Sequence, residues 1–319
     1  MNSPDGVEHF VTLFDSNFLP MGMTLHGSLM NHATSFHLWI ICMDEQVEEQ
    51  LTRIALPHVT LLPLREVETR ELLAVKPGRN SREYCWTVTP FSFRAVFQRD
   101  GSVQRVTYLD ADLFFFADPR ILLGELNESG KDVLITEHAF APEHSCFLAA
   151  SGRFCVQFLT FRRTAAAAKV MGWWQEKCLE WCFDRMEEER FGDQKYLDLW
   201  PELFPHEVHI LRRTEKTLAP WNVNYVEEKS CGNIDPVFYH FQGLRITGVR
   251  RVQLHNENYA VGRDGQRLYD EYLAELGNCI TTLQRFGMAL PLLNGYLTTK
   301  GRLLALIRRN PCVVRLRSW

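Results

Sequence analysis

Three apolar runs alternate with two amphipathic stretches in the first 75 residues, and this alternation restricts the fold more than any other feature of the chain. The runs cover residues 10–14, 36–43 and 59–64, and each has the length of a strand. Apolar residues recur at every fourth position between residues 21 and 29, which is helical spacing. Asp44 is a suitable N-cap for a second helix. This strand and helix order is typical of a parallel sheet covered by helices.

A further apolar run ends on two acids, Asp110 and Asp112, which are separated by one residue. In a strand such residues point to the same side, so the two carboxylates converge. Open α/β sheets bind their ligands at this end of their strands. Two hard oxygen donors suit Mg²⁺ or Mn²⁺, which complete their coordination with phosphate and water. Taken alone, the pair is equally well interpreted as two solvated acids in a loop after a strand.

Residues 76–86 form a polar, basic stretch that contains glycine, with Lys76, Arg79 and Arg82 among its residues. We predict a loop here, either beside the candidate site or simply solvated at the surface. Thr89 and Pro90 follow as a suitable N-cap and first residue of the next helix.

The composition is that of an ordinary soluble globular protein. Of the 319 residues, 46% are hydrophobic and 23% are charged, which suffices for a core that needs no disulfide or metal. A net charge of −4 and a pI near 6.3 exclude a chain built as a whole to bind nucleic acid. The nine cysteines are scattered, with no C-x-x-C, so we expect reduced thiols in a cytosolic protein.

Neither a signal peptide nor a membrane span is expected. The first ten residues contain Asp5 and Glu8 and no apolar run. No uncharged apolar run approaches the ~20 residues that cross a bilayer. Residues 300–319 carry six cations and no acid among several leucines. This segment is either a peripheral contact with the anionic inner membrane surface or a C-terminal helix packed on its own domain.

An ordered set of motifs carries a resemblance to a known family. The motifs are VTLFDSNF at 11–18, YLDAD at 108–112, SGRF at 151–154, FLTFR at 158–162, GDQ at 192–194 and HFQG at 240–243. In this order the chain resembles the family 8 glycosyltransferases and related nucleotide-diphospho-sugar transferases of the GT-A fold. The resemblance implies a Rossmann-like α/β fold with a mixed, mainly parallel central sheet flanked by helices. The motifs lie within a predicted catalytic domain at 1–248, and the charged, helical pattern after Gly248 predicts a mostly helical extension with a basic tail at 249–319.

The resemblance also implies a metal site formed by Asp110, Asp112 and His240. A divalent cation there would act as a Lewis acid on the diphosphate leaving group. Imidazole is a more usual ligand of Mn²⁺ than of Mg²⁺, so Mn²⁺ is expected, with Mg²⁺ as the alternative. For His240 alone, its apolar neighbours Tyr239 and Phe241 offer another interpretation, a core histidine.

Residues that bind the donor and the acceptor follow from the same resemblance. The donor-binding residues it implies are Asp15, Asn17, Arg94, Asp110, Gln157, Gly243 and Arg245. Asp193 and Gln194 match the catalytic pair on the acceptor side, and the Gln194 amide would stabilise positive charge at the anomeric carbon. The residue-based alternative for Asp193 is a helix N-cap. The family usually has Asn-x-Gly where this chain has Cys155-Val156-Gln157, which predicts an altered sugar pocket.

The leading hypothesis is a metal-dependent, retaining hexosyltransferase. It would move a sugar from a nucleotide-diphosphate donor, with a UDP-sugar favoured, to a glycan or lipid-linked acceptor in cell-surface polysaccharide synthesis. One alternative is a phosphatase resembling the haloacid dehalogenases, in which the first aspartate of the D-x-D is a nucleophile. The other alternative is a sugar-nucleotide or glycan-binding protein without catalysis.

Overall fold

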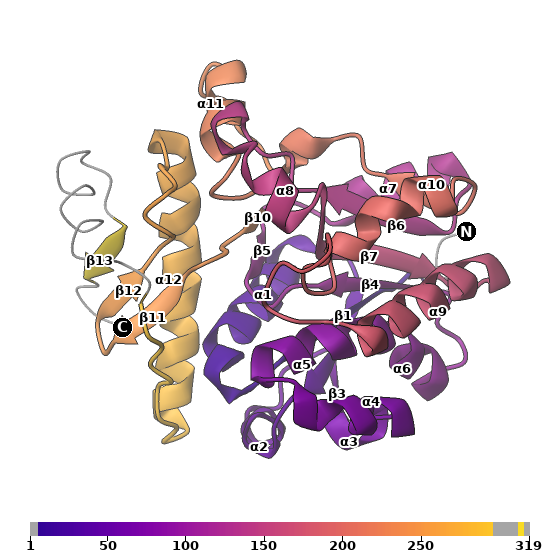
Figure 1. Ribbon diagram of the computed structural model, residues 1–319. Coiled ribbons are helices and arrows are strands. Elements are labelled where there is room, and N and C mark those ends of the chain that lie inside the picture. The colour runs from indigo at the N-terminus through magenta and orange to yellow at the C-terminus, as the bar shows by residue number, and fades with distance from the viewer. Residues whose placement is uncertain (1–5, 296–311, 316–319) are drawn as a thin grey trace. The chain divides into compact units, whose positions relative to one another are not determined.

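The computed structural model describes residues 6–295 and 312–315, and the chain forms two compact units (Figure 1). Unit 1 comprises Met1–Asp15, Thr34–Asp110 and Arg120–Thr214, and unit 2 comprises Ser16–Ala33, Ala111–Pro119 and Glu215–Trp319. The domain boundary at residue 248 stays a prediction. The membrane contact predicted for residues 300–319 lies outside the described residues, apart from 312–315.

Unit 1 is built on a seven-stranded sheet with the strand order β3-β2-β1-β4-β7-β6-β8. Its strands are β1 (Glu8–Phe14), β2 (Phe36–Cys42), β3 (Val59–Pro63), β4 (Arg105–Leu109), β6 (Val133–Glu137), β7 (Phe154–Arg162) and β8 (Val208–Ile210). All neighbouring strands run parallel except β7, which is antiparallel to both β4 and β6. The predicted class, a mixed and mainly parallel α/β sheet, is confirmed.

Helices flank this sheet. They are α2 (Glu45–Ile54), α3 (Leu64–Val67), α4 (Arg70–Val75), α5 (Ser81–Val88), α6 (Ser92–Arg99), α7 (Arg120–Ser129), α8 (Phe147–Ser151), α9 (Ala165–Glu180) and α10 (Trp200–Leu203). Helix α6 packs on β1 and β4, and α9 packs on α4 and α5. The core between these layers includes Phe93, Trp174 and Trp200, all fully buried. Burial of such large aromatic side chains is a major contribution to stability.

The prediction of a loop over residues 76–86 is wrong, because most of this stretch is helical. A short 3-10 segment, η2 (Lys76–Gly78), leads into α5. There the Asn80 side chain accepts from the Glu83 backbone N–H at 3.0 Å, and the Glu83 carboxylate accepts from the Asn80 N–H at 2.9 Å. This capping box starts the helix. Thr89 is not an N-cap either, since its hydroxyl donates to the Cys85 carbonyl at 3.0 Å and the chain continues helically.

The described residues of unit 2 form two small sheets and two long helices. In one sheet, β5 (Leu113–Phe115) pairs antiparallel with β10 (Phe238–His240), which pairs parallel with β9 (Thr217–Leu218). The other sheet joins β11 (Arg245–Gly248), β12 (Arg251–Gln253) and β13 (Val313–Arg315). Helix α1 (Leu19–His32) packs along α12 (Arg263–Arg285), and α11 (Val223–Lys229) is a shorter third helix. None of the helices in the described ranges is long and apolar enough to span a bilayer.

Candidate functional site

Strands β1 and β4 of unit 1 lie side by side, and each is followed by an acid from the predicted site. Val11 of β1 is level with Tyr108 of β4, so Asp15 and Asp110 follow the carboxyl ends of the two strands at the same edge of the sheet. Strands β2 and β4 lie on opposite sides of β1. The strand order therefore switches direction here, and ligands of open α/β sheets bind at such switch points.

Asp110 is held in place by contacts with β7 and with its own strand. Its backbone N–H donates to the Gln157 carbonyl at 3.0 Å, and the Tyr108 hydroxyl donates to its carboxylate at 3.0 Å. Burial and the Asp110 charge raise the pKa of the Tyr108 hydroxyl well above its usual value, so this hydroxyl stays a donor. Gln157 itself is buried in β7.

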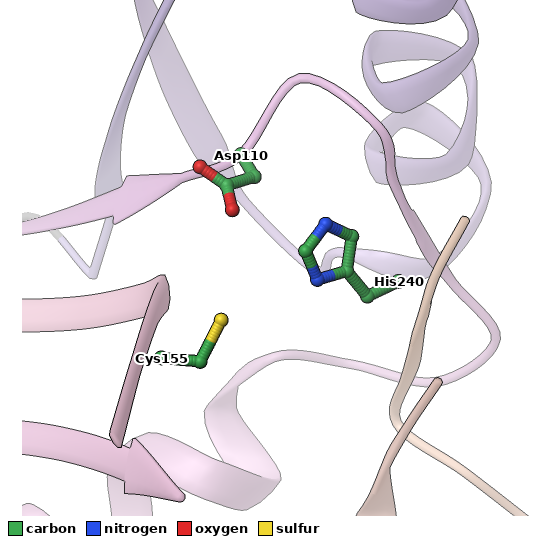
Figure 2. A group of neighbouring side chains, drawn as sticks. All are labelled: Asp110, Cys155 and His240. Atoms are coloured by element: carbon green, nitrogen blue, oxygen red, sulfur yellow. The ribbon is translucent and has the colours of Figure 1, made fainter. Parts of the chain in front are cut away.

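Cys155 lies at the same edge of the sheet, at a position where the sequence departs from the family pattern. Its thiol sulfur and a carboxylate oxygen of Asp110 lie within 4.8 Å of each other, and Figure 2 shows the two groups turned toward one another. Cys155 and Gln157 stand two apart on one strand, so they share a face. That spacing is the signal by which Cys155 could have been found.

Asp193 is a buried acid whose carboxyl group interacts with that of Asp110. Burial, followed by the negative charge of Asp110, raises the pKa of Asp193 to about 8. Hydrogen bonds from the backbone N–H groups of Asp193 and Gln194 oppose this rise only in part. The indole N–H of Trp174 donates to the Asp193 carbonyl at 2.9 Å and fixes the backbone. Asp193 is not a helix N-cap, because the 3-10 segment η5 (Lys195–Leu199) has Gln194 at that position.

Gln194 is half-buried and tied to the neighbouring loop. Its side-chain NH₂ donates to the Ser151 carbonyl at 2.8 Å. An amide group has two donor hydrogens and one acceptor oxygen, so this bond leaves the oxygen to accept from elsewhere. The amide is thus oriented by the protein before any ligand binds.

Asp15 and Arg94 have different surroundings. Burial, then the charges of Asp15, Asp44 and Asp193, raise the pKa of the Cys85 thiol to about 12. Arg94 lies exposed on α6, where its charge interacts with Glu71 of α4. Asp193 interacts with Asp110, and the charges of Asp193 and Asp15 both act on the Cys85 thiol, whereas the charge of Arg94 acts on Glu71.

In unit 2, Asp112 and His240 are direct partners. The β5–β10 pairing sets His240 opposite Leu113, and the imidazole Nε2 lies 3.0 Å from the Asp112 carboxylate. The Trp221 ring meets the imidazole edge to face at 5.5 Å. His240, also drawn in Figure 2, is buried as a core histidine would be, but its partner is an acid.

Positive charge offsets the burial of Asp112. Burial alone would raise its pKa, but the charge interaction and hydrogen bond with His240, and the charge of Arg245, hold it below the usual value. The Arg245 guanidinium donates to the Leu244 carbonyl at 2.7 Å and lies 5.2 Å from the Phe18 ring centre. Asp112 is therefore a carboxylate at neutral pH.

Gly243 and Asn17 complete the set of predicted residues in unit 2. Gly243 has φ +85°, a left-handed conformation that favours glycine, and a side chain there would meet the backbone of Asn256. Asn17 is exposed in a 3-10 segment, η1 (Ser16–Phe18). Gly243 therefore has a backbone conformation suited to a tight loop, and Asn17 has a side chain that a ligand could reach.

The site and fold define an α/β protein in which Asp15 and Asp110 follow neighbouring strands at the switch point of the main sheet and Asp110 interacts with the buried Asp193. No protein-family model matches the chain. Two proteins of Bacillus subtilis (strain 168) do match it. YfnD is 31% identical over 254 residues, which is 77% of this chain and 81% of YfnD. YfnF is 31% identical over 288 residues, which is 86% of this chain and 94% of YfnF. The chain belongs to the family of YfnD and YfnF, both of which are named as uncharacterized proteins.

Some solved structures resemble the chain with lower sequence identity. Mouse xyloside xylosyltransferase 1 in its apo form is 14% identical with a TM-score of 0.48, covering 74% of this chain and 98% of that one. The galactosyltransferase LgtC, in complex with donor and acceptor sugar analogs, is 12% identical with a TM-score of 0.49, covering 85% of this chain and 95% of that one. At these scores the likenesses carry no conclusion about what the chain does.

Proposed function

We propose that the protein is a metal-dependent, retaining glycosyltransferase. It moves a hexose-type sugar from a nucleotide-diphosphate donor, favouring a UDP-sugar, to a glycan or lipid-linked acceptor. The motif resemblance to family 8 supplies the reaction class, and the arrangement of acids in unit 1 supplies the physical support.

The observation that carries the proposal is the interaction of Asp193, which is buried, with Asp110, which follows β4 at the switch point of the sheet. Like charges kept close in a buried place are unfavourable, and Asp193 responds by holding a proton up to a pH of about 8. A protein that needed these residues only for stability would gain by replacing one of them. A site for a cation and a polar ligand explains why they stand together.

The donor set fits a divalent cation. The Asp112 carboxylate and the His240 imidazole are already adjacent in unit 2. Asp110 precedes Asp112 by two positions in the chain. Because two residues of extended backbone span at most about 7 Å, the Cα atoms of the two aspartates lie within that distance. Two carboxylates and one imidazole suit Mn²⁺, and Mg²⁺ is the alternative. When bound, the cation would stabilise the negative charge of the diphosphate leaving group.

Each remaining residue has a role in this proposal. Asp15 and Asn17 would hydrogen-bond the nucleoside, with Asp110 shared between the metal and the ribose. Arg245 would pair with the diphosphate, since a guanidinium binds phosphate through two hydrogen bonds. The Gln194 amide oxygen would face the positive charge that develops at the anomeric carbon. Asp193, protonated at neutral pH, would donate a hydrogen bond to a sugar hydroxyl. Arg94, Gln157 and Gly243 stay proposed donor-site residues.

The cellular part of the proposal is cell-surface polysaccharide synthesis from the cytoplasmic side. Acceptors for such synthesis are carried on lipids, and the six cations of residues 300–319 suit contact with an anionic inner leaflet.

Nucleotide release from a panel of UDP-sugars, measured with and without Mn²⁺, tests the proposal. Wild-type protein should release UDP from at least one donor only when the metal is present. Asp112→Asn should lower the rate by about 100-fold or more, the size of effect seen when one transition-state interaction is removed. Asp235→Asn, which alters an exposed acid of unit 2, is the matched control and should be as active as wild type.

Two outcomes would overturn the proposal. One is the absence of nucleotide release from every donor with either metal. The other is a phosphoenzyme trapped at Asp110, which would support the phosphatase instead. Retention is tested separately, by the anomeric configuration of the product.

A further inference from the structure

Arginine side chains and aromatic rings are interleaved on one part of unit 1. The rings of Trp181 and Phe183 meet edge to face, with centres 5.3 Å apart. The Arg79 guanidinium lies over Phe183 at 3.8 Å, and that of Arg185 lies over the same ring at 4.4 Å. Arg190 lies over Trp181 at 5.0 Å. Such stacking holds the planar guanidinium groups in fixed orientations.

Most arginines of this surface have an acidic partner. The pairs are Arg82 with Asp184 at 2.6 Å, Arg185 with Glu187 at 2.8 Å and Arg190 with Glu188 at 2.7 Å. Arg79 differs from them. In the part of the chain that the structure describes, Arg79 forms no salt bridge, and its buried Nε has no hydrogen-bond acceptor. The Arg190 Nε also lacks an acceptor, but that side chain is neutralised by its acid.

Glu83 is the acid near Arg79, and its oxygens are already in use. One carboxylate oxygen accepts from the Asn80 backbone N–H at 2.9 Å, and the other accepts from the Asp184 backbone N–H at 3.0 Å. The Arg79 charge helps to lower the pKa of Glu83 without a hydrogen bond between them. Among the described residues, no carboxylate accepts a hydrogen bond from the Arg79 guanidinium, which is half-buried and stacked on Phe183.

Arg79 is connected to the acceptor-side pair of the proposed function through Phe183 and Gly192. Arg79 stacks on the Phe183 ring, and the Phe183 backbone carbonyl accepts from the Gly192 N–H at 3.1 Å. Gly192 has φ +54°, and a side chain there would meet the Trp86 ring, so this turn is tightly packed. Asp193 and Gln194 follow directly. The charges of Asp193 and Arg79 also both act on the buried thiol of Cys178.

We propose that Arg79 binds an anionic group of the acceptor, so that this transferase acts on a phosphorylated or acidic glycan. A guanidinium offers two parallel N–H donors to phosphate or carboxylate, and its stack on Phe183 orients them in advance. Arg79 belongs to a basic stretch that the proposed metal and donor roles do not use. This proposal rests on the proposed glycosyltransferase activity.

Matched acceptors that differ only in charge test the proposal. The panel is methyl glucoside, its 6-phosphate and methyl glucuronide, with KM and kcat measured for each. Wild-type protein should favour one of the two anionic acceptors by about 10- to 100-fold, mainly through KM, as expected for a charged hydrogen bond made in both ground and transition states. Preference for the phosphate or for the glucuronide identifies the source of the negative charge.

Substitutions then assign the preference to Arg79. Arg79→Gln should abolish it, so that neutral and anionic acceptors become equal. Arg79→Lys should keep part of a phosphate preference and lose a carboxylate preference, because lysine is a point charge without the fork. Arg82→Gln removes a neighbouring arginine that already has Asp184 as its partner, and it should behave as wild type.

The outcomes separate this proposal from the one on which it rests. If the wild-type protein releases no nucleotide from any donor, the glycosyltransferase itself is wrong. If it transfers sugar but does not distinguish the charged acceptors from methyl glucoside, or if Arg79→Gln distinguishes them as well as wild type, the role of Arg79 is wrong. Inorganic phosphate gives a readout that needs no turnover. Phosphate should quench the tryptophan fluorescence of wild-type protein, and an equal response of Arg79→Gln or Arg79→Lys at the same concentrations would also refute the role.

Discussion

Asp193→Asn should make the metal-free protein more stable, in contrast to most substitutions of a buried residue. The pKa of Asp193 is about 8 in the folded protein, while an aspartate in an unfolded chain has a pKa of about 3.9. Between these values the folded state holds one proton more than the unfolded state. Stability therefore falls as pH rises, by about 1.4 kcal/mol per pH unit, and becomes constant above a pH of about 8. Asparagine does not titrate and avoids this loss.

The magnitude follows from the two pKa values. Wild-type protein should have lost about 3 kcal/mol of unfolding free energy at pH 6 and about 5 kcal/mol at pH 8, relative to low pH. Urea unfolding of EDTA-treated wild type and Asp193→Asn between pH 5 and 8 measures the difference. The stability advantage of the variant should grow steadily over this range. Asp235→Asn, at an exposed position, should show no such trend.

A difference between Asp193→Asn and wild type that does not change with pH would refute this reasoning, as would a variant less stable than wild type at pH 8. Added Mn²⁺ provides a second check. A cation on Asp110 would remove the negative charge that helps to raise the pKa of Asp193. The advantage of the variant should then shrink, whereas an unchanged advantage would argue against a metal at Asp110.

Three further predictions concern single contacts. Arg105 and Glu8 form a buried salt bridge at 2.6 Å, with side chains 2% and 8% exposed. Arg105→Ala should therefore lower the unfolding free energy, measured by urea titration, by about 3–5 kcal/mol. A loss below about 1 kcal/mol would contradict this prediction. Asn80→Ala removes a capping box and should lower the unfolding free energy by about 1 kcal/mol, and equal stability would show that the cap is dispensable. His240→Ala should abolish the rise in Tm that Mn²⁺ gives to wild-type protein, and a retained rise would exclude His240 as a ligand.

The pattern of apolar residues in the sequence predicts the order of the first strands and helices and the class of the main sheet. Strands β1 to β3 and the helices that follow them show a clear period, so their order and the parallel sheet are readable. The prediction of a loop at residues 76–86 is wrong because glycine and basic side chains are typical of loops. The deciding signal was local and small, the spacing of Asn80 and Glu83 in the capping box. Composition over a window averages such a signal away.

The candidate site was only partly predictable. An acid after a strand is visible in sequence, and this predicts Asp110, whereas Asp15 is implied by the family resemblance. Their electrostatic state is not visible, because Asp193 lies 83 positions from Asp110 in the chain and meets it only in the folded sheet. For Arg94 the family resemblance predicts a side chain that faces the donor, but in the structure this side chain is exposed on α6. Its neighbours Phe93 and Val96 face the core, so the turn of the helix leaves Arg94 exposed.

Two aspartates of this protein have opposite pKa shifts, and the contrast separates their proposed roles. Asp112, whose side chain is 15% exposed, lies beside His240 and within the field of Arg245, so it stays ionised, as its proposed role as a metal ligand requires. For Asp193 no cation of the described residues lowers the pKa, and burial together with Asp110 keeps it protonated near neutral pH, which makes it a hydrogen-bond donor. Environments that push the pKa values of two carboxyl groups apart assign different chemistry to identical side chains. Removing the positive charge of Arg245 should make the surroundings of Asp112 more like those of Asp193. We expect this change to weaken the proposed metal binding more than it lowers the stability of the fold.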